Sequence, residues 1–324
     1  MNKFKAVFIS ALVLISMSAI SAPKVYGKLN IAVNNDGSDV TANADNSNDI
    51  DLISNASRLG FKGKVDMKNG LTGIYQIEYE VDITNDDTKD KAFNQRNSFV
   101  GLKGNFGTFK LGTYDTPLKL AQLKADLFND LKGDIKNITD GENRIGSFFG
   151  YDSPVFGGGV SISLGLGKGE DDEEAGSDLD GEFGSNISIS LKYDIDVIKF
   201  ALATEKASIK GFDHNRLGMM IPAGPVTIGF IYTSTETTDI SDGRDAVDYN
   251  ATTISISAKV ADGKGKFKFQ HGRSDKSAGL RQTQIGYDHK LFKNFKIFGY
   301  HTARSSDAAN SDKAYTGLGI EYKF

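Results

Sequence analysis

Three aspartates within one short segment are the first candidates for a chemical role: Asp126, Asp130 and Asp134. Asp126 and Asp130 are four residues apart, a spacing that places two side chains on one face of a helix. Grouped carboxylates can oppose basic side chains across a narrow gap and create a local field there. These aspartates lie in the stretch 114–144, which lacks the apolar–polar alternation of most of the chain.

Other residue types give weaker candidates for chemistry. The four histidines lack the close spacing of metal ligands, and the absence of cysteine excludes thiolate sites and disulfides. No Gly-x-Ser-x-Gly motif marks a nucleophilic serine, although a Ser–His pair assembled in space would make the chain a hydrolase. The acidic run at 170–182 could bind Ca²⁺, but it lacks EF-hand spacing, and a solvated loop is the simpler interpretation. We therefore expect no enzyme, no metal site and no cofactor.

The stretch 114–144 is predicted to begin as a helix. Asp115 or Thr116 could cap it, with Pro117 at its first position. Leucines then recur at the three- and four-residue spacing of a helical stripe, at Leu120, Leu123, Leu127 and Leu131. A non-strand insert of this length is uncommon between strands and often carries function.

The N-terminus has the three parts of a secretory signal peptide: a basic start, an apolar run over 6–20 and small residues at Ser21 and Ala22. We predict a signal peptide over 1–22 and one barrel domain over 23–324. Removal of the signal lowers the Lys and Arg count from 38 to 36 against 42 acidic residues, a formal charge of −6. An acidic chain of this kind is unsuited to binding nucleic acid.

Alternation of apolar and polar residues dominates the rest of the chain. In one stretch Tyr75 and Ile77 share one side of a strand, while Gln76 and Glu78 share the other. A soluble sandwich would bury the apolar side, whereas a membrane barrel turns it to lipid. Sixteen stretches are predicted as strands: 24–33, 52–64, 71–83, 94–103, 108–114, 144–152, 160–167, 187–193, 197–206, 214–221, 225–235, 248–260, 265–272, 280–290, 294–304 and 313–324.

The connections between these strands favour the membrane barrel. Short turns alternate with long polar loops, as in outer-membrane barrels, where the short turns are periplasmic. An open sheet edge would be unsatisfied in lipid, so the sheet has to close. We predict an all-β fold, a 16-stranded antiparallel transmembrane β-barrel with an aqueous lumen and an inward-folded third loop. The terminal Phe324, after alternating apolar residues, resembles the signal read by the outer-membrane barrel assembly machinery.

Several motifs resemble those of the trimeric Gram-negative general diffusion porins. Residues 57–63 (SRLGFKG) resemble the family's second strand. Residues 96–103 (RNSFVGLK) and 106–112 (FGTFKLG) resemble the strands that lead into its constriction loop, and 151–156 (YDSPVF) the turn after that loop. The resemblance implies a homotrimer in the outer membrane of a Gram-negative bacterium, in contact with lipopolysaccharide.

The resemblance also implies roles for individual residues. A basic ladder on the barrel wall would face the third loop, and the matching positions here are Lys28, Arg58, Arg96 and Arg144. The first three lie on the polar sides of their predicted strands, and Arg144 is out of register with the apolar residues that follow it. Many family members carry Pro-Glu-Phe-Gly-Gly at the loop tip. This chain does not, so the acidic side is assigned to Asp126, Asp130 and Asp134 from composition alone.

These features together predict a general diffusion porin. Ions and small hydrophilic solutes would pass through a lumen narrowed by the third loop, at about 115–143. The formal charge of −6 and the acidic outer loops predict a mild preference for cations. A substrate-selective channel, an outer-membrane hydrolase and a plugged structural or adhesive barrel are the alternatives.

Overall fold

A computed structural model describes residues 22–37, 49–84, 92–168, 183–206, 212–237, 248–276, 279–308 and 312–324. The predicted signal peptide, apart from Ala22, and the acidic run at 170–182 lie outside the described residues. Within them, no helix is both long and apolar enough to cross a membrane.

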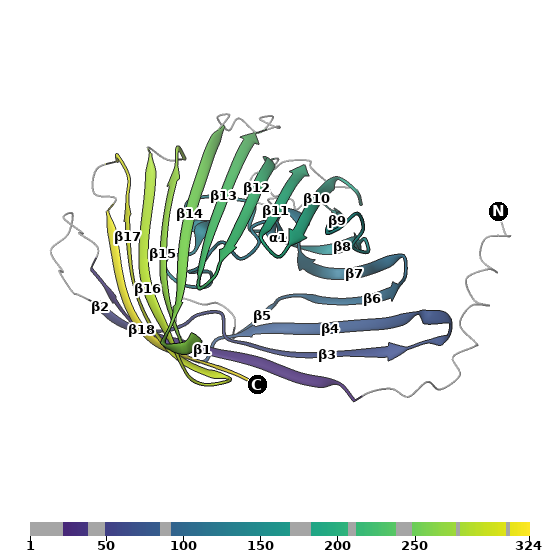
Figure 1. The fold of residues 1–324 in the computed structure, drawn as a ribbon, viewed down its shortest axis with the longest axis horizontal. Helices are drawn as coiled ribbons and strands as arrows, with labels where there is room; N and C mark the ends of the chain where they lie inside the picture. The colour runs from purple at the N-terminus through teal and green to yellow at the C-terminus, as the bar shows by residue number, and fades with distance from the viewer. Residues whose placement is uncertain are drawn as a thin grey trace.

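Antiparallel strands make up most of the described chain (Figure 1). The strands are β1 (Lys24–Asp36), β2 (Asp49–Ser54), β3 (Arg58–Asp66), β4 (Thr72–Val81), β5 (Phe93–Gln95), β6 (Ser98–Gly104), β7 (Gly107–Asp115), β8 (Arg144–Asp152), β9 (Val160–Gly167), β10 (Asn186–Ile195), β11 (Ile198–Lys206), β12 (Phe212–Ala223), β13 (Val226–Thr237), β14 (Tyr249–Val260), β15 (Gly265–Ser274), β16 (Leu280–Phe292), β17 (Phe295–Ser305) and β18 (Lys313–Lys323). The helical pieces are α1 (Pro117–Leu120) and the 3₁₀ turns Lys68–Gly70, Ile135–Asn137 and Ala261–Gly263.

These segments form one closed barrel of sixteen strands, as predicted. β2 and β3 both pair with β1, and β5 and β6 both pair with β4, so each of these two pairs is a single interrupted strand. β1 also pairs with β18, and the two lie side by side in Figure 1. At this closure the backbones of Gly27 and Phe324 exchange hydrogen bonds of 3.1 and 3.2 Å. The sheet therefore closes on itself, as a barrel in lipid requires.

The side chains are arranged in the reverse of a soluble protein. Apolar residues on the outer faces are exposed, such as Val100 at 60% and Leu318 at 70%. Polar residues on the inner faces are buried, and Ser188, Thr233 and Gln282 are fully covered. A soluble domain would bury its apolar side chains. The arrangement fits a barrel with lipid outside and water inside.

The third long loop is less helical than its leucine spacing predicts. Thr116 caps α1 by accepting the Lys119 N–H at 3.2 Å, with Pro117 in the first turn, as expected. The predicted helical stripe beyond Leu120 is wrong. Leu123 and Asp130 have φ of 56° and 70°, and the left-handed conformation interrupts an α-helix of L-residues.

Candidate functional site

Residues 116–143 leave the wall after β7, return at β8 and pack against inner-face side chains of many strands. The Leu118 N–H donates to Ser188 Oγ of β10 at 3.1 Å. Gln270 of β15 accepts from the Leu127 N–H at 2.8 Å, and Gln284 of β16 donates to the Gly133 carbonyl at 2.8 Å. Because these strands lie at different positions around a closed sheet, the segment reaches all of them only from inside the barrel. We call residues 116–143 the internal segment.

Glycines in the wall let the internal segment approach closely. A Cβ at Gly218 of β12 would lie 1.9 Å from the carbonyl oxygen of Ala121. A Cβ at Gly272 of β15 would lie 2.1 Å from Cδ1 of Ile138. Any larger residue at these two positions would push the internal segment away from the wall.

A buried arginine on β12 fixes the two ends of the internal segment. The Arg216 side chain is 0% exposed and donates to Glu142 Oε1 at 2.6 Å. The same guanidinium donates to the carbonyl oxygens of Asp140 at 2.9 Å and Leu118 at 3.5 Å, and to Thr233 Oγ1 at 3.1 Å. Removing one partner of a buried ion pair is strongly destabilising, because it leaves the other charge uncompensated.

Asp130 is the predicted acidic residue that meets the predicted basic residues. Its Oδ2 accepts from Lys28 Nζ at 2.8 Å and from Arg58 Nη2 at 2.7 Å. Burial acts to raise the pKa of the Asp130 carboxyl, but the charges of Lys28 and Arg58 outweigh it and hold that pKa below its usual value. The Asp130 side chain is 17% exposed, so the carboxylate is paired and still borders the cavity described below.

Asp126 and Asp134 mainly organise the backbone of the internal segment. Asp126 accepts the N–H groups of Phe128 and Ile135 at 3.0 and 3.3 Å. Asp134 accepts those of Asp130 and Lys136 at 3.1 and 2.9 Å. Both residues are buried, and burial is the main cause that raises the pKa of each carboxyl, to about 8 for Asp126.

Arg96 and Arg144 lie on the wall but bind acidic residues that the sequence argument did not assign. Arg96 forms ion pairs of 2.9 Å with both Glu78 and Glu80 of the neighbouring strand. Arg144 binds Asp115, the last residue of β7, at 2.9 Å. The alternation in 71–83 already places Glu78 and Glu80 on the polar side of β4. From this pattern their ion pairs with Arg96 could have been predicted.

A cavity of about 1140 Å³ lies between the internal segment and the inner wall. Arg58, Arg96 and Arg144 line it from the wall, while Asp130 and Lys132 line it from the internal segment. Ten basic and seven acidic side chains border it in total. The predicted basic residues other than Lys28 therefore share one water-accessible space with the internal segment, and that space carries an excess of positive charge.

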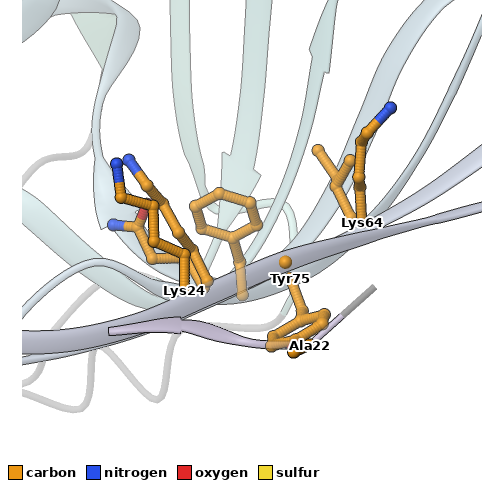
Figure 2. Close-up of a pocket in the computed structure, with 9 residues that line it drawn as sticks. Ala22, Lys24, Lys64 and Tyr75 are labelled. Atoms are coloured by element: carbon orange, nitrogen blue, oxygen red, sulfur yellow. The ribbon is translucent and has the colours of Figure 1, made fainter. Parts of the chain in front are cut away.

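Lysines extend along the inner wall toward the short-turn end of the barrel. A groove of about 390 Å³ is lined by Lys24, Lys62 and Lys64. Figure 2 shows Lys24 and Lys64 rising on one side of the strands, while the ring of Tyr75 lies on the other side. This contrast follows the alternation of the sequence, with the two lysines toward the lumen and Tyr75 toward lipid.

The histidines do not form a reactive cluster in the described part of the chain. His214, His271 and His301 each contact a threonine hydroxyl, at 3.1, 2.8 and 2.9 Å, and His289 contacts Tyr287 at 3.1 Å. Among the described residues, no three histidine, aspartate or glutamate side chains are placed to hold a metal ion.

Sequence comparison finds relatives among outer-membrane proteins. Residues 9–311 match the family described as Gram-negative porin. The major outer membrane protein P.IB of Neisseria gonorrhoeae is 34% identical over 106 residues, which cover 32% of this chain and 30% of that protein. P.IB of Neisseria meningitidis serogroup A is 30% identical over 162 residues, covering 48% of this chain and 47% of that protein. The matches thus span about half or less of these relatives' length.

Solved structures of porins share the fold. An anion-selective porin from Comamonas acidovorans superposes with a TM-score of 0.72 at 21% identity, covering 94% of this chain and 99% of that one. The trimer form of OmpT from Vibrio cholerae superposes with a TM-score of 0.66 at 14% identity, covering 94% and 99%. The family match, the relatives and the closed barrel place the protein in the outer membrane of a Gram-negative bacterium. The chain belongs to the Gram-negative porin family.

Proposed function

We propose that this porin is a general diffusion channel, through which ions and small hydrophilic solutes pass passively, and that residues 115–143 form its constriction. The observation that carries the proposal is the cavity of about 1140 Å³ between the internal segment and the wall that bears Arg58, Arg96 and Arg144. Charged side chains and pore width together decide which solutes pass such a gap.

Planar-bilayer recording of the purified protein tests this function. We expect stepwise, persistently open channels whose conductance rises in proportion to KCl concentration. Arg58→Ala is expected to change the single-channel conductance, since Arg58 borders the constriction. Lys64→Ala, which removes an equal charge near the short-turn end of β3, serves as the matched control. A folded, heat-modifiable protein that shows no conductance would refute the proposal.

The charges that line the cavity argue against the cation preference expected from the whole chain. Ten basic side chains outnumber seven acidic ones there, and the raised pKa of Asp126 reduces the negative charge further. A permeating ion responds most strongly to charges within a Debye length, about 10 Å at 0.1 M salt. We therefore propose a weak preference for anions. The sign of the zero-current potential in a salt gradient decides between the two expectations.

The assembly and export of the protein are part of the same proposal. The family resemblance supports a homotrimer, a cleaved signal peptide over 1–22, contact with lipopolysaccharide and recognition of Phe324 by the barrel assembly machinery. Phe324 closes the barrel through its backbone bonds to Gly27, while its side chain is 45% exposed. Mass spectrometry of the mature N-terminus and of the intact assembly tests the cleavage site and the oligomeric state. Loss of barrel insertion on removal of Phe324 tests its recognition.

The family and the fold point to a channel rather than an enzyme. In the described chain, the histidine contacts involve threonine and tyrosine hydroxyls rather than serine. If lipid hydrolysis accompanied the purified protein and disappeared with one Ser–His pair, the hydrolase alternative would replace this one. Saturable block of the current by one solute would favour a substrate-selective channel.

A further inference from the structure

A second cavity, of about 340 Å³, lies between the internal segment and the wall formed by β15 to β18 and β1. Its wall carries Lys266, Lys268, Lys296 and Lys323. Lys266 and Lys296 are each the second residue of a strand that follows a short turn, and Lys323 ends β18. The cavity therefore lies toward the short-turn end, which is periplasmic in barrels of this class. We call these four lysines the lysine cluster.

The carboxylates beside the lysine cluster are each shared by two cations. Asp288 binds Lys268 at 2.8 Å and Lys296 at 3.1 Å. Glu321 binds Lys296 at 3.5 Å and Lys323 at 3.0 Å. Two carboxylates thus face four ammonium groups once Lys266 is included, and the local charge is positive before any solute enters.

The internal segment, which contributes Asp126, Asp130 and Lys124 to the lining, lowers this excess only slightly. Asp130, which borders the same cavity, already binds Lys28 and Arg58. Lys124 of the internal segment also lines the cavity. Over the whole lining, seven basic side chains face four acidic ones. Within the described chain, neither Lys124 nor Lys266 has a carboxylate within ion-pair distance.

The types of side chain indicate which anion would fit. A guanidinium binds a carboxylate or a phosphate through two parallel hydrogen bonds in one plane, whereas lysine ammonium groups act as point charges that commonly bind phosphate. The wall between β15 and β18 supplies four lysines, and the one arginine of this cavity, Arg58, is already bound to Asp130. A compact oxyanion with charge on several oxygens can accept from several lysines at once.

We propose that the lysine cluster is a binding site for a small phosphate-class dianion that enters from the short-turn end. The site lies across the internal segment from the wall that bears Arg96 and Arg144, which do not line it. An anion held there would occupy the part of the ion path that lies toward the short-turn end of the barrel. The proposal adds a binding site to the proposed channel. It rests on the channel function only in experiments that measure current.

Two measurements on the full-length, detergent-purified protein test the site. Isothermal calorimetry with inorganic phosphate at mildly alkaline pH should give saturable binding, whether or not the protein conducts. In planar bilayers, phosphate should reduce the chloride current when it is added at the short-turn side and much less from the loop side. Succinate at equal concentration should be the weaker blocker.

Variants locate the binding. Lys266→Gln and Lys296→Gln should each raise the half-saturating phosphate concentration about tenfold, the effect of one lost charge-assisted hydrogen bond. Lys64→Gln removes the same charge from the groove beyond the cluster and should leave phosphate binding unchanged. Equal effects of all three variants, equal block by succinate, or an open channel without phosphate binding would each overturn the site. Binding without any conductance would instead refute the channel function and leave the site standing.

Discussion

Asp130→Asn gives the sharpest test of the constriction, because it removes one charge at a known place with little change in shape. The carboxylate accepts from Lys28 and Arg58 at 2.8 and 2.7 Å, and its removal leaves both cations without this partner. An ion about 6 Å away feels about 0.7 kcal/mol from one charge in water, reduced by screening to about 0.4 kcal/mol at 0.1 M salt. The variant loses this attraction for cations and this repulsion of anions, so the anion-to-cation permeability ratio should rise about fourfold.

The assay is the zero-current potential of single channels in KCl gradients at low and high mean concentration. The shift should shrink strongly near 1 M salt, where the Debye length is about 3 Å. Asp66→Asn is the matched control, because Asp66 is exposed at the end of β3, where it pairs with Lys64. A shift toward cations, or an equal shift in both variants, would refute the placement of Asp130 at the ion path.

Three further changes probe how the internal segment is held. Arg216→Ala leaves Glu142 buried without its partner, which should lower the free energy of unfolding by roughly 3–5 kcal/mol. We expect noisier channels and a lower temperature for the heat-induced mobility shift on gels. Unaltered current traces would contradict this role of Arg216. Gly218→Val should displace the internal segment and change the conductance. Gly146→Ala should behave like wild type, because the added Cβ would lie 3.6 Å from its nearest neighbour, Thr113 Oγ1. Burial raises the pKa of Asp126 from 3.8 to about 8, so the folded state keeps a proton that the unfolded state releases. Stability should therefore fall as the pH rises from about 4 to about 8, and Asp126→Asn should flatten this dependence; an equal slope in the variant would show that another group is responsible.

The barrel could be predicted from sequence because its determinants are local. Alternation at period two fixes which side of each strand meets lipid, and the turn composition fixes the connections. Two strands are interrupted, at 55–57 and 96–97, and the alternation of the sequence did not predict these breaks. The pieces on either side of each break still pair with the same neighbouring strand.

The path of the internal segment could not be predicted in the same way. Leu123, Lys124 and Asp130 adopt positive φ, which their residue types do not announce, and contacts with distant strands hold them there. The pairing of Asp130 with Lys28 joins residues 102 positions apart. Composition groups the three aspartates in one segment, but only the fold shows that Asp130 pairs with basic residues of the wall while Asp126 and Asp134 mainly accept backbone N–H groups.

The attachment points of the internal segment also have a mechanical consequence. Leu118 is hydrogen-bonded to β10 and Asp130 is paired with Lys28 of β1, and these strands are seven places apart one way round the sixteen-stranded barrel and nine the other. A wide barrel filled with water has no packed core to resist flattening under the lateral pressure of the bilayer. The eleven residues between these attachments connect distant parts of the wall, so the contacts proposed to narrow the pore should also resist flattening of the barrel.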